Sequence, residues 1–114
     1  MNINLEEYAF AIHSNAVEKG FWSPLDRMEP QDHVVFYIKQ LAMIDSEVAE
    51  TLEAVRKDKG EREVVFEMAD ILIRLLDLWA GMQRNGEVRT LLTDALVEKM
   101  AANMGRPQLH GVRA

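Results

Sequence analysis

Apolar residues recur along most of the chain with the three- and four-residue spacing of α-helices, and no segment shows the alternation of a β-strand. The first such segment is preceded by Asn4, a good N-cap residue, and followed by Gly20, a good C-terminal stop. Its apolar positions are Leu5, Tyr8, Ala9, Ile12 and Ala16. The pattern therefore predicts a helix from about residue 5 to residue 19.

Three longer segments with the same periodicity predict helices at about residues 32–57, 61–83 and 89–104. Only a short glycine-containing turn, residues 57–60, separates the first two, so these helices are expected to form an antiparallel hairpin. Residues 21–31 contain two prolines and are predicted to form a loop, and residues 106–114 a C-terminal tail.

The two hairpin helices carry broad apolar stripes that we expect to form the core. The stripe of the first comprises Val34, Val35, Ile38, Leu41, Ala42, Val48, Ala49, Leu52 and Val55. That of the second comprises Val64, Val65, Met68, Ala69, Leu72, Leu75, Leu76 and Trp79. The predicted fold is a small all-α four-helix bundle, a single domain over residues 1–114. Because such a unit leaves part of the second stripe uncovered, a homo-oligomer is expected.

Composition narrows the functional classes. The absence of cysteine excludes disulfides and thiolate metal sites. A net charge of −6 argues against binding to a nucleic-acid polymer. No apolar run approaches the length of a membrane span, and the first seven residues do not resemble a signal peptide. A cytoplasmic protein without membrane contact is therefore expected.

Two acidic pairs flank the predicted turn. Glu47 and Glu50 lie three residues apart before it, and Glu67 and Asp70 lie three residues apart after it. Each pair shares a helix face. The two pairs are equally distant in sequence from the centre of the turn, so an antiparallel hairpin places all four at one level. Carboxylates brought together need a compensating cation, and Mg²⁺ is commonly held by a few carboxylates and substrate phosphates.

Such pairs also occur on ordinary solvated helix faces, so the spacing alone leaves both interpretations open. Arg74 follows Asp70 by one turn and can pair with it or approach a phosphate. Asp77, one turn further on, is a candidate supporting group. A carboxylate-bridged di-iron bundle is excluded, because the chain contains no Glu-x-x-His.

The segments containing these pairs, residues 46–56 and 67–77, resemble the MazG-like all-α nucleoside triphosphate pyrophosphatases, which carry E-x-x-E, a spacer and E-x-x-D. The resemblance extends to His13-x-x-Ala16-x-x-Lys19-Gly20-Phe21-Trp22. It extends also to Lys99-Met-Ala-Ala-Asn103-Met-Gly-Arg106-Pro107 with His110-Gly111. Together these segments cover most of the chain. The resemblance also favours a homodimer or homotetramer as the oligomer.

The resemblance implies hydrolysis of (deoxy)nucleoside triphosphates to monophosphate and pyrophosphate with Mg²⁺, or with Mn²⁺ as the alternative ion. It assigns the metal to Glu47, Glu50, Glu67 and Asp70. The hydrolysis also needs a base toward the attacking water, and Glu47 is the candidate. It assigns nucleotide contacts to His13, Lys19, Trp22, Lys99, Asn103 and Arg106, of which the last three would contact the triphosphate and His13 and Trp22 the base.

Other interpretations remain open at this point. Of the adjacent aromatics Phe21 and Trp22, one can stack on a nucleobase while the other plugs the bundle. The acidic stripe can also belong to a noncatalytic helical interaction module. A third alternative keeps the fold and changes the substrate, for example to phosphoribosyl-ATP. The role in the cell, nucleotide-pool control or housecleaning, is likewise open.

Overall fold

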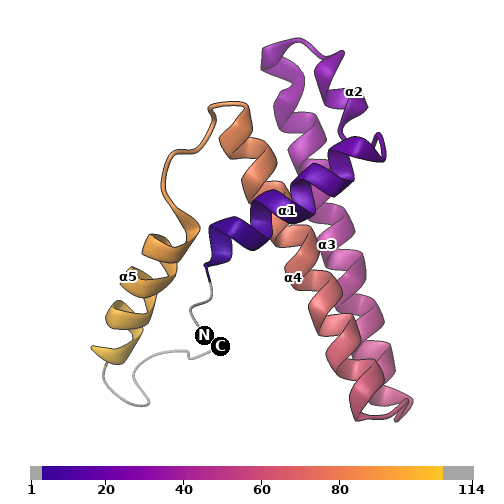
Figure 1. Cartoon of the computed structure of the whole chain (residues 1–114). Helices are drawn as coiled ribbons and strands as arrows, with labels where there is room; N and C mark the ends of the chain where they lie inside the picture. Colours follow the sequence, from indigo (N-terminus) through magenta and orange to yellow (C-terminus); the bar gives the residue numbers. More distant parts are fainter. Residues whose placement is uncertain (1–3, 107–114) are drawn as a thin grey trace.

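The computed structural model describes residues 4–106, and this part of the chain is helical, without strands. Its elements in order are α1 (Leu5–Glu18), α2 (Ser23–Asp26), the 3₁₀ helix η1 (Pro30–Asp32), α3 (His33–Arg56), α4 (Glu61–Arg84) and α5 (Leu92–Met104) (Figure 1). The predicted all-α class is confirmed. None of these helices is both long enough and apolar enough to cross a membrane.

Local sequence signals set most helix ends. The Asn4 side chain accepts hydrogen bonds from the backbone N–H groups of Glu6 and Glu7 at 3.0 and 3.3 Å, as an N-cap does. Gly20 has φ +84° immediately after α1, a conformation that favours glycine. α5 begins at Leu92, later than predicted, because the preceding segment is extended. The indole N–H of Trp79 donates to the backbone oxygen of Thr90 at 3.1 Å and holds that segment against α4.

The predicted loop at residues 21–31 is corrected by the structure, which places α2 and η1 within it. Prolines at the beginnings of these two elements supply the helical φ angle without losing a needed N–H donor. The segment is also well packed, because Trp22 and Leu25 are each only 1% exposed. Its apolar residues thus form part of the core.

α3 and α4 form the predicted antiparallel hairpin, and α1 crosses it (Figure 1). Asp58 and Gly60 adopt positive φ angles of 50° and 102° in the connecting turn. The backbone N–H groups of Asp58 and Lys59 donate to the oxygens of Val55 and Ala54 and close the end of α3. α4 makes extensive contacts with both α3 and α1.

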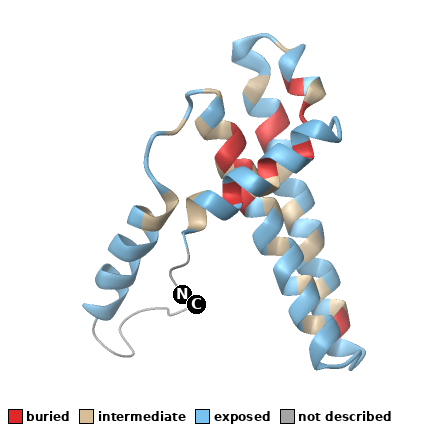
Figure 2. Ribbon diagram, viewed as in Figure 1, coloured by how far each residue is buried: buried red, intermediate tan, exposed pale blue. Residues whose placement is uncertain are grey.

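The core lies where α1 and α2 meet the hairpin, seen as the red segments in Figure 2. One cluster comprises Ala16, Trp22, Leu25, Phe36, Tyr37 and Leu78, and a second comprises Ala9, Leu76 and Ala80. Gly81 makes the first possible, since a Cβ atom at this position would lie 2.0 Å from the Trp22 ring. The glycine thus provides the space for the largest buried side chain.

α5 is attached through its first turn and then projects away from the hairpin (Figure 1). The backbone N–H and the hydroxyl of Thr93 donate to the two carboxylate oxygens of Glu6 at 2.8 and 2.7 Å. Leu92 packs against the second core cluster. From Leu96 onward every described residue is exposed. A four-helix bundle is therefore not confirmed within one chain.

Most of the stripe predicted to form the hairpin core is exposed in a single chain, which corrects that prediction. The following side chains are each between 42% and 59% exposed: Val34, Ile38, Leu41, Val48, Leu52 and Val55 on α3, and Val65, Met68, Leu72 and Leu75 on α4. The inner rows contain instead Ile44 and Ala54 on α3, and Val64 and Ile71 on α4. Of these four residues, Val64 alone was in a predicted stripe. Leu76 is covered, because α1 packs over it.

Candidate functional site

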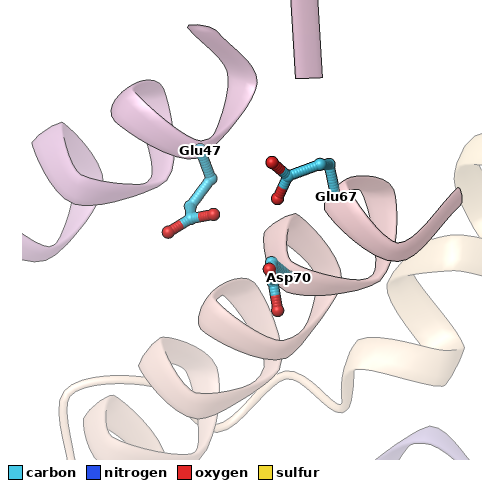
Figure 3. A group of neighbouring side chains, drawn as sticks. All are labelled: Glu47, Glu67 and Asp70. Carbon is cyan, nitrogen blue, oxygen red and sulfur yellow. The ribbon is translucent and has the colours of Figure 1, made fainter. Parts of the chain in front are cut away.

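Three carboxylates from the two hairpin helices converge. Glu47 of α3 faces Glu67 and Asp70 of α4 (Figure 3), and one oxygen of each lies within 4.8 Å of one oxygen of both others. Glu47 and Glu67 are half-buried, and Asp70 is exposed. The tight turn at residues 57–60 fixes the register that brings these residues to one level.

The two half-buried acids occupy positions that ordinarily hold apolar side chains. On α3, Glu47 lies one turn from the half-buried Ile44, and on α4, Glu67 lies one turn from the half-buried Val64 and Ile71. These are the rows along which the helices meet. The charged pair therefore interrupts the hairpin contact, at a cost that a compensating cation would relieve.

Glu50, the fourth predicted ligand, lies at the edge of this cluster. It is exposed and does not belong to the group of three converging carboxylates. Instead it lines, with Glu67 and Lys59, a shallow hollow of about 210 Å³. The structure thus brings three of the four predicted acids together and places the fourth beside them.

The electrostatics of the cluster match a cation site. Partial burial raises the pKa of Glu67, and the negative charges of Glu50 and Asp70 raise this pKa further. Oxygen donors without nitrogen or sulfur are the ligands that hard divalent cations take. The donor set present therefore fits Mg²⁺ or Mn²⁺.

Arg74 supplies a positive charge to the same site. Its Nε donates to Oε1 of Glu47 at 3.0 Å, and its Nη1 lies 4.0 Å from the sulfur of Met43. The sequence left Arg74 to pair with Asp70 or a phosphate, and the structure pairs it with Glu47. The register of the hairpin could have predicted this contact from the sequence. Because Asp70 lies opposite Glu47, a long side chain one turn further along α4 comes within reach of Glu47.

A cavity of about 350 Å³ adjoins the acidic cluster and extends beneath α1. Its walls come from α1, the segment after α1, α3 and α4. The lining residues are Ile12, Asn15, Ala16, Phe21, Glu47, Asp70, Ile73, Arg74 and Asp77. It falls within the size range of small-molecule sites and joins charged groups to an apolar wall.

His13 and Trp22 lie in the core behind this cavity. His13 is 6% exposed, and its Nδ1 lies 2.8 Å from Oδ1 of Asp77. The indole N–H of Trp22 donates to both carboxylate oxygens of Asp77 at 3.0 and 3.1 Å. The Trp22 ring lies 5.0 Å from that of Phe36. Trp22 therefore plugs the bundle, while Phe21, 63% exposed, lines the cavity.

The remaining predicted nucleotide contacts lie elsewhere in the chain. Lys19 is exposed at the C-terminal end of α1. Lys99, Asn103 and Arg106 are exposed on or just after the part of α5 that projects away from the hairpin, so one chain does not bring them to the carboxylates. Pro107, His110 and Gly111, part of the resemblance, lie outside the described residues.

Sequence reasoning alone did not connect Asp77, Phe21 and Asn15 to one site. Asp77 lies 64 residues from His13 and 55 from Trp22, and no local pattern specifies contacts of that separation. Comparison with protein-family models, curated proteins and solved structures finds no match to this chain. The chemistry of the site therefore has to be argued from its own residues.

Proposed function

We propose that the protein hydrolyses (deoxy)nucleoside triphosphates to nucleoside monophosphate and pyrophosphate in a Mg²⁺-dependent reaction. The observation that carries the proposal is the convergence of Glu47, Glu67 and Asp70 at one end of a cavity that Phe21 lines. The resemblance of the acidic segments to MazG-like pyrophosphatases supports it. The proposed setting is cytoplasmic, in nucleotide-pool control or housecleaning.

In this proposal Glu47, Glu67 and Asp70 hold the cation, and Glu50 adds negative charge at the edge. Mg²⁺ is the proposed ion, and Mn²⁺, which accepts the same oxygen donors, is the alternative. When bound, such an ion neutralises phosphate charge and acidifies water. Glu47 accepts from Arg74 through Oε1, which leaves Oε2 to take a proton from the attacking water.

The water oxygen forms a bond to the α-phosphorus, and the bond from that phosphorus to the α–β bridging oxygen breaks. The bridging oxygen leaves with the pyrophosphate, and the water proton passes to Glu47. Because carboxylates alone would repel this polyanion, the remaining charge compensation falls to Arg74, the cation among the residues that line the cavity.

Phe21 is the proposed stacking surface for the nucleobase. It is 63% exposed at the cavity, whereas Trp22 is enclosed. Stacking of a base on an aromatic ring contributes about 1–3 kcal/mol and tolerates different bases. This assigns to Phe21 the role that the resemblance gave to Trp22, and leaves His13 and Trp22 in the core, in contact with Asp77.

We further propose that the working unit is a homodimer or homotetramer. The exposed stripes of α3 and α4 repeat at three- and four-residue spacing, the pattern that packs helices into bundles. Two hairpins packed through them form a four-helix bundle. In such an assembly the projecting α5 of one copy can bring Lys99, Asn103 and Arg106 toward the triphosphate of another.

A noncatalytic interaction module is the second candidate, and the same exposed stripes favour it. It differs from the enzyme in what Mg²⁺ does, because a surface that only binds proteins has no use for the carboxylate cluster. A pyrophosphatase acting on phosphoribosyl-ATP would share the metal site and differ in the products released.

The test is a panel of ribo- and deoxyribonucleoside triphosphates, with phosphoribosyl-ATP, incubated with and without Mg²⁺ and resolved by chromatography. We expect monophosphate and pyrophosphate only with the ion. Glu67→Gln should lower kcat/KM by about 100-fold or more, because it removes a charge that the cation and transition state require. Glu63→Gln, one turn away and outside the converging group, is the matched control and should retain activity.

Two results would decide against the enzyme. Full activity in Glu67→Gln would show that the carboxylate cluster does not act in the reaction. Absence of turnover on the whole panel, together with no Mg²⁺- or Mn²⁺-dependent shift in the melting temperature, would favour the interaction module, since a bound ligand stabilises the folded state.

A further inference from the structure

The cavity lining combines charged and apolar side chains. Glu47, Asp70 and Arg74 supply the charges of the proposed metal site, and Ile12, Ala16, Phe21 and Ile73 supply apolar surface. Two polar side chains, Asn15 and Asp77, line the cavity outside the metal cluster. The proposed reaction gives neither of them a role.

The distance along α4 between Asp70 of the carboxylate cluster and Asp77 suits a nucleotide. Asp70 and Asp77 lie seven residues apart on α4, which separates them by about 10 Å along the helix axis. Arg74 lies between them. A ligand whose phosphates are held at the Asp70 end therefore places its base, two helical turns away, beside Asp77 and Phe21.

Asp77 is held in one orientation by buried donors. Its Oδ1 accepts from Trp22 and contacts His13, while its Oδ2 shares only the Trp22 indole N–H, at 3.1 Å. Rotation of the carboxylate would leave buried N–H groups without partners, at a cost of about 1–3 kcal/mol each. The Asp77 side chain is still 19% exposed. Oδ2 therefore retains acceptor capacity for a ligand.

A carboxylate accepts hydrogen bonds and donates none. Cytosine and adenine carry an amino group at ring position 4 or 6, which can donate to such an oxygen. Uracil, thymine and hypoxanthine carry a carbonyl oxygen at the same position. This oxygen and the carboxylate are both acceptors, so they would repel each other and form no hydrogen bond. The Asn15 amide both donates and accepts, so it can pair with the neighbouring ring nitrogen of the amino-bearing bases.

We propose that this cavity selects nucleoside triphosphates whose base carries an exocyclic amino group at pyrimidine position 4 or purine position 6, read by Asp77 with Asn15. The inference rests on the proposed function, because that function places a nucleotide in the cavity. Asp77 is a specificity-determining residue on this view, and Trp22 and His13 position it.

The test uses two substrate pairs that differ in this one group, CTP with UTP and ATP with ITP. We expect kcat/KM with Mg²⁺ to favour the amino member of each pair by about 10-fold or more, since a site built to hydrogen-bond a group discriminates against analogues that lack it. Equal values, or a preference for the keto members, would overturn the inference while leaving the pyrophosphatase proposal intact.

Binding separates the two proposals when none of the four is hydrolysed. The dissociation constants of the α,β-imido analogues of CTP and UTP are then measured in the presence of Mg²⁺. Tighter binding of the cytidine analogue supports recognition of the base by Asp77, even though the reaction proposal has failed. Equal binding of both, or binding of neither, contradicts it.

Asp77→Asn identifies the residue responsible. Its amide oxygen can still accept from Trp22, but its NH₂ group replaces an acceptor in the cavity, so the CTP:UTP ratio should fall to near one or invert. Asp94→Asn, on α5 and outside the cavity lining, is the control and should leave the ratio unchanged. If Asp77→Asn does not fold, Asn15→Leu should still reduce the ratio. An unchanged ratio in a folded cavity variant would contradict the assignment.

Discussion

Two regions of the hairpin differ in how well they are covered. One is the crossing, where α1 crosses the hairpin and α2 packs against it, and the other is the arm that leads to the turn, residues 47–70 (Figure 1). At the crossing, side chains such as Trp22, Leu25 and Phe36 are almost fully buried. Along the arm, Ala54 is the buried side chain among residues 47–70 (Figure 2). The crossing has a third element to cover the hairpin, whereas toward the turn only α3 and α4 continue among the described residues (Figure 1).

The difference locates stability and chemistry in separate places. Burial of large apolar side chains contributes about 1.5–3 kcal/mol each, and this contribution is concentrated at the crossing. In the arm, Glu47 and Glu67 occupy part of the row along which α3 and α4 meet. Their mutual repulsion contributes to the raised pKa of Glu67. The crossing therefore stabilises a frame on which the less stable arm can carry a charged site.

The largest expected effect comes from breaking the crossing at Gly81. Gly81→Ala places a Cβ atom 2.0 Å from the Trp22 ring, which has no free space to enter. We expect a loss of about 3 kcal/mol or more in the free energy of unfolding, measured by urea denaturation. Gly105→Ala is the control, because a Cβ there meets its nearest atom at 3.6 Å, and it should change stability little. Equal stability of the two variants would contradict this account of the core.

A charge on the exposed apolar stripe of α4 should disrupt the proposed oligomer and have little effect on the stability of the single chain. Leu72 is 50% exposed, so Leu72→Glu should change the stability of an isolated chain by only about 0.5 kcal/mol or less. It should nevertheless dissociate the oligomer, since a carboxylate in an apolar interface is costly. Sedimentation velocity measures this, with Val17→Glu on α1 as the control. A monomeric wild-type protein at working concentration would contradict the proposed assembly.

The smallest effect concerns the joint between α1 and α5, by which we mean the two hydrogen bonds from Thr93 to Glu6. Hydrogen bonding from the Thr93 backbone N–H lowers the pKa of Glu6 below its usual range. The unfolded-state pKa is then the higher of the two, so this contribution is complete above that value and is lost as pH falls through the folded-state pKa.

We expect Glu6→Gln to weaken the joint by about 1 kcal/mol at neutral pH, as loss of a helix cap does. Hydrogen exchange in the first turn of α5 should accelerate accordingly. The difference from wild type should shrink as pH falls through the folded-state pKa of Glu6. Glu7→Gln, on the same turn of α1, is the control, and a difference that persists at acid pH would argue against the carboxylate as the cause.

The sequence predicted those parts of the fold that local spacing determines. The ends of α3 and α4, the turn at residues 57–60 and the shared level of the acidic pairs all depend on helical period and turn chemistry. The rotation of each helix about its axis is not determined by helical period or turn chemistry. It decides that Ile44 faces the hairpin partner while Ile38 is exposed, and that Glu50 lies at the edge of the carboxylate cluster.

The less predictable part of the site depends on long-range contacts. The spacing of Phe21 and Trp22 offered two roles without assigning them, because the space for the Trp22 ring comes from Gly81 on another helix. The role of Asp77 likewise depends on donors that come from α1 and from the start of α2. The metal, the substrate and the oligomer remain predictions.

The hydrogen bond between Trp22 and Asp77 also gives the molecule an optical property. The chain has two tryptophans. Trp22 is enclosed and bonded to a carboxylate of the cavity wall, whereas Trp79 is bonded to the backbone of Thr90, just before α5. Their fluorescence therefore reports on separate places, the cavity in one case and the root of α5 in the other. A variant that lacks Trp79 would report on the cavity through Trp22, and a variant that lacks Trp22 would report on the start of α5 through Trp79. Neither needs an added dye.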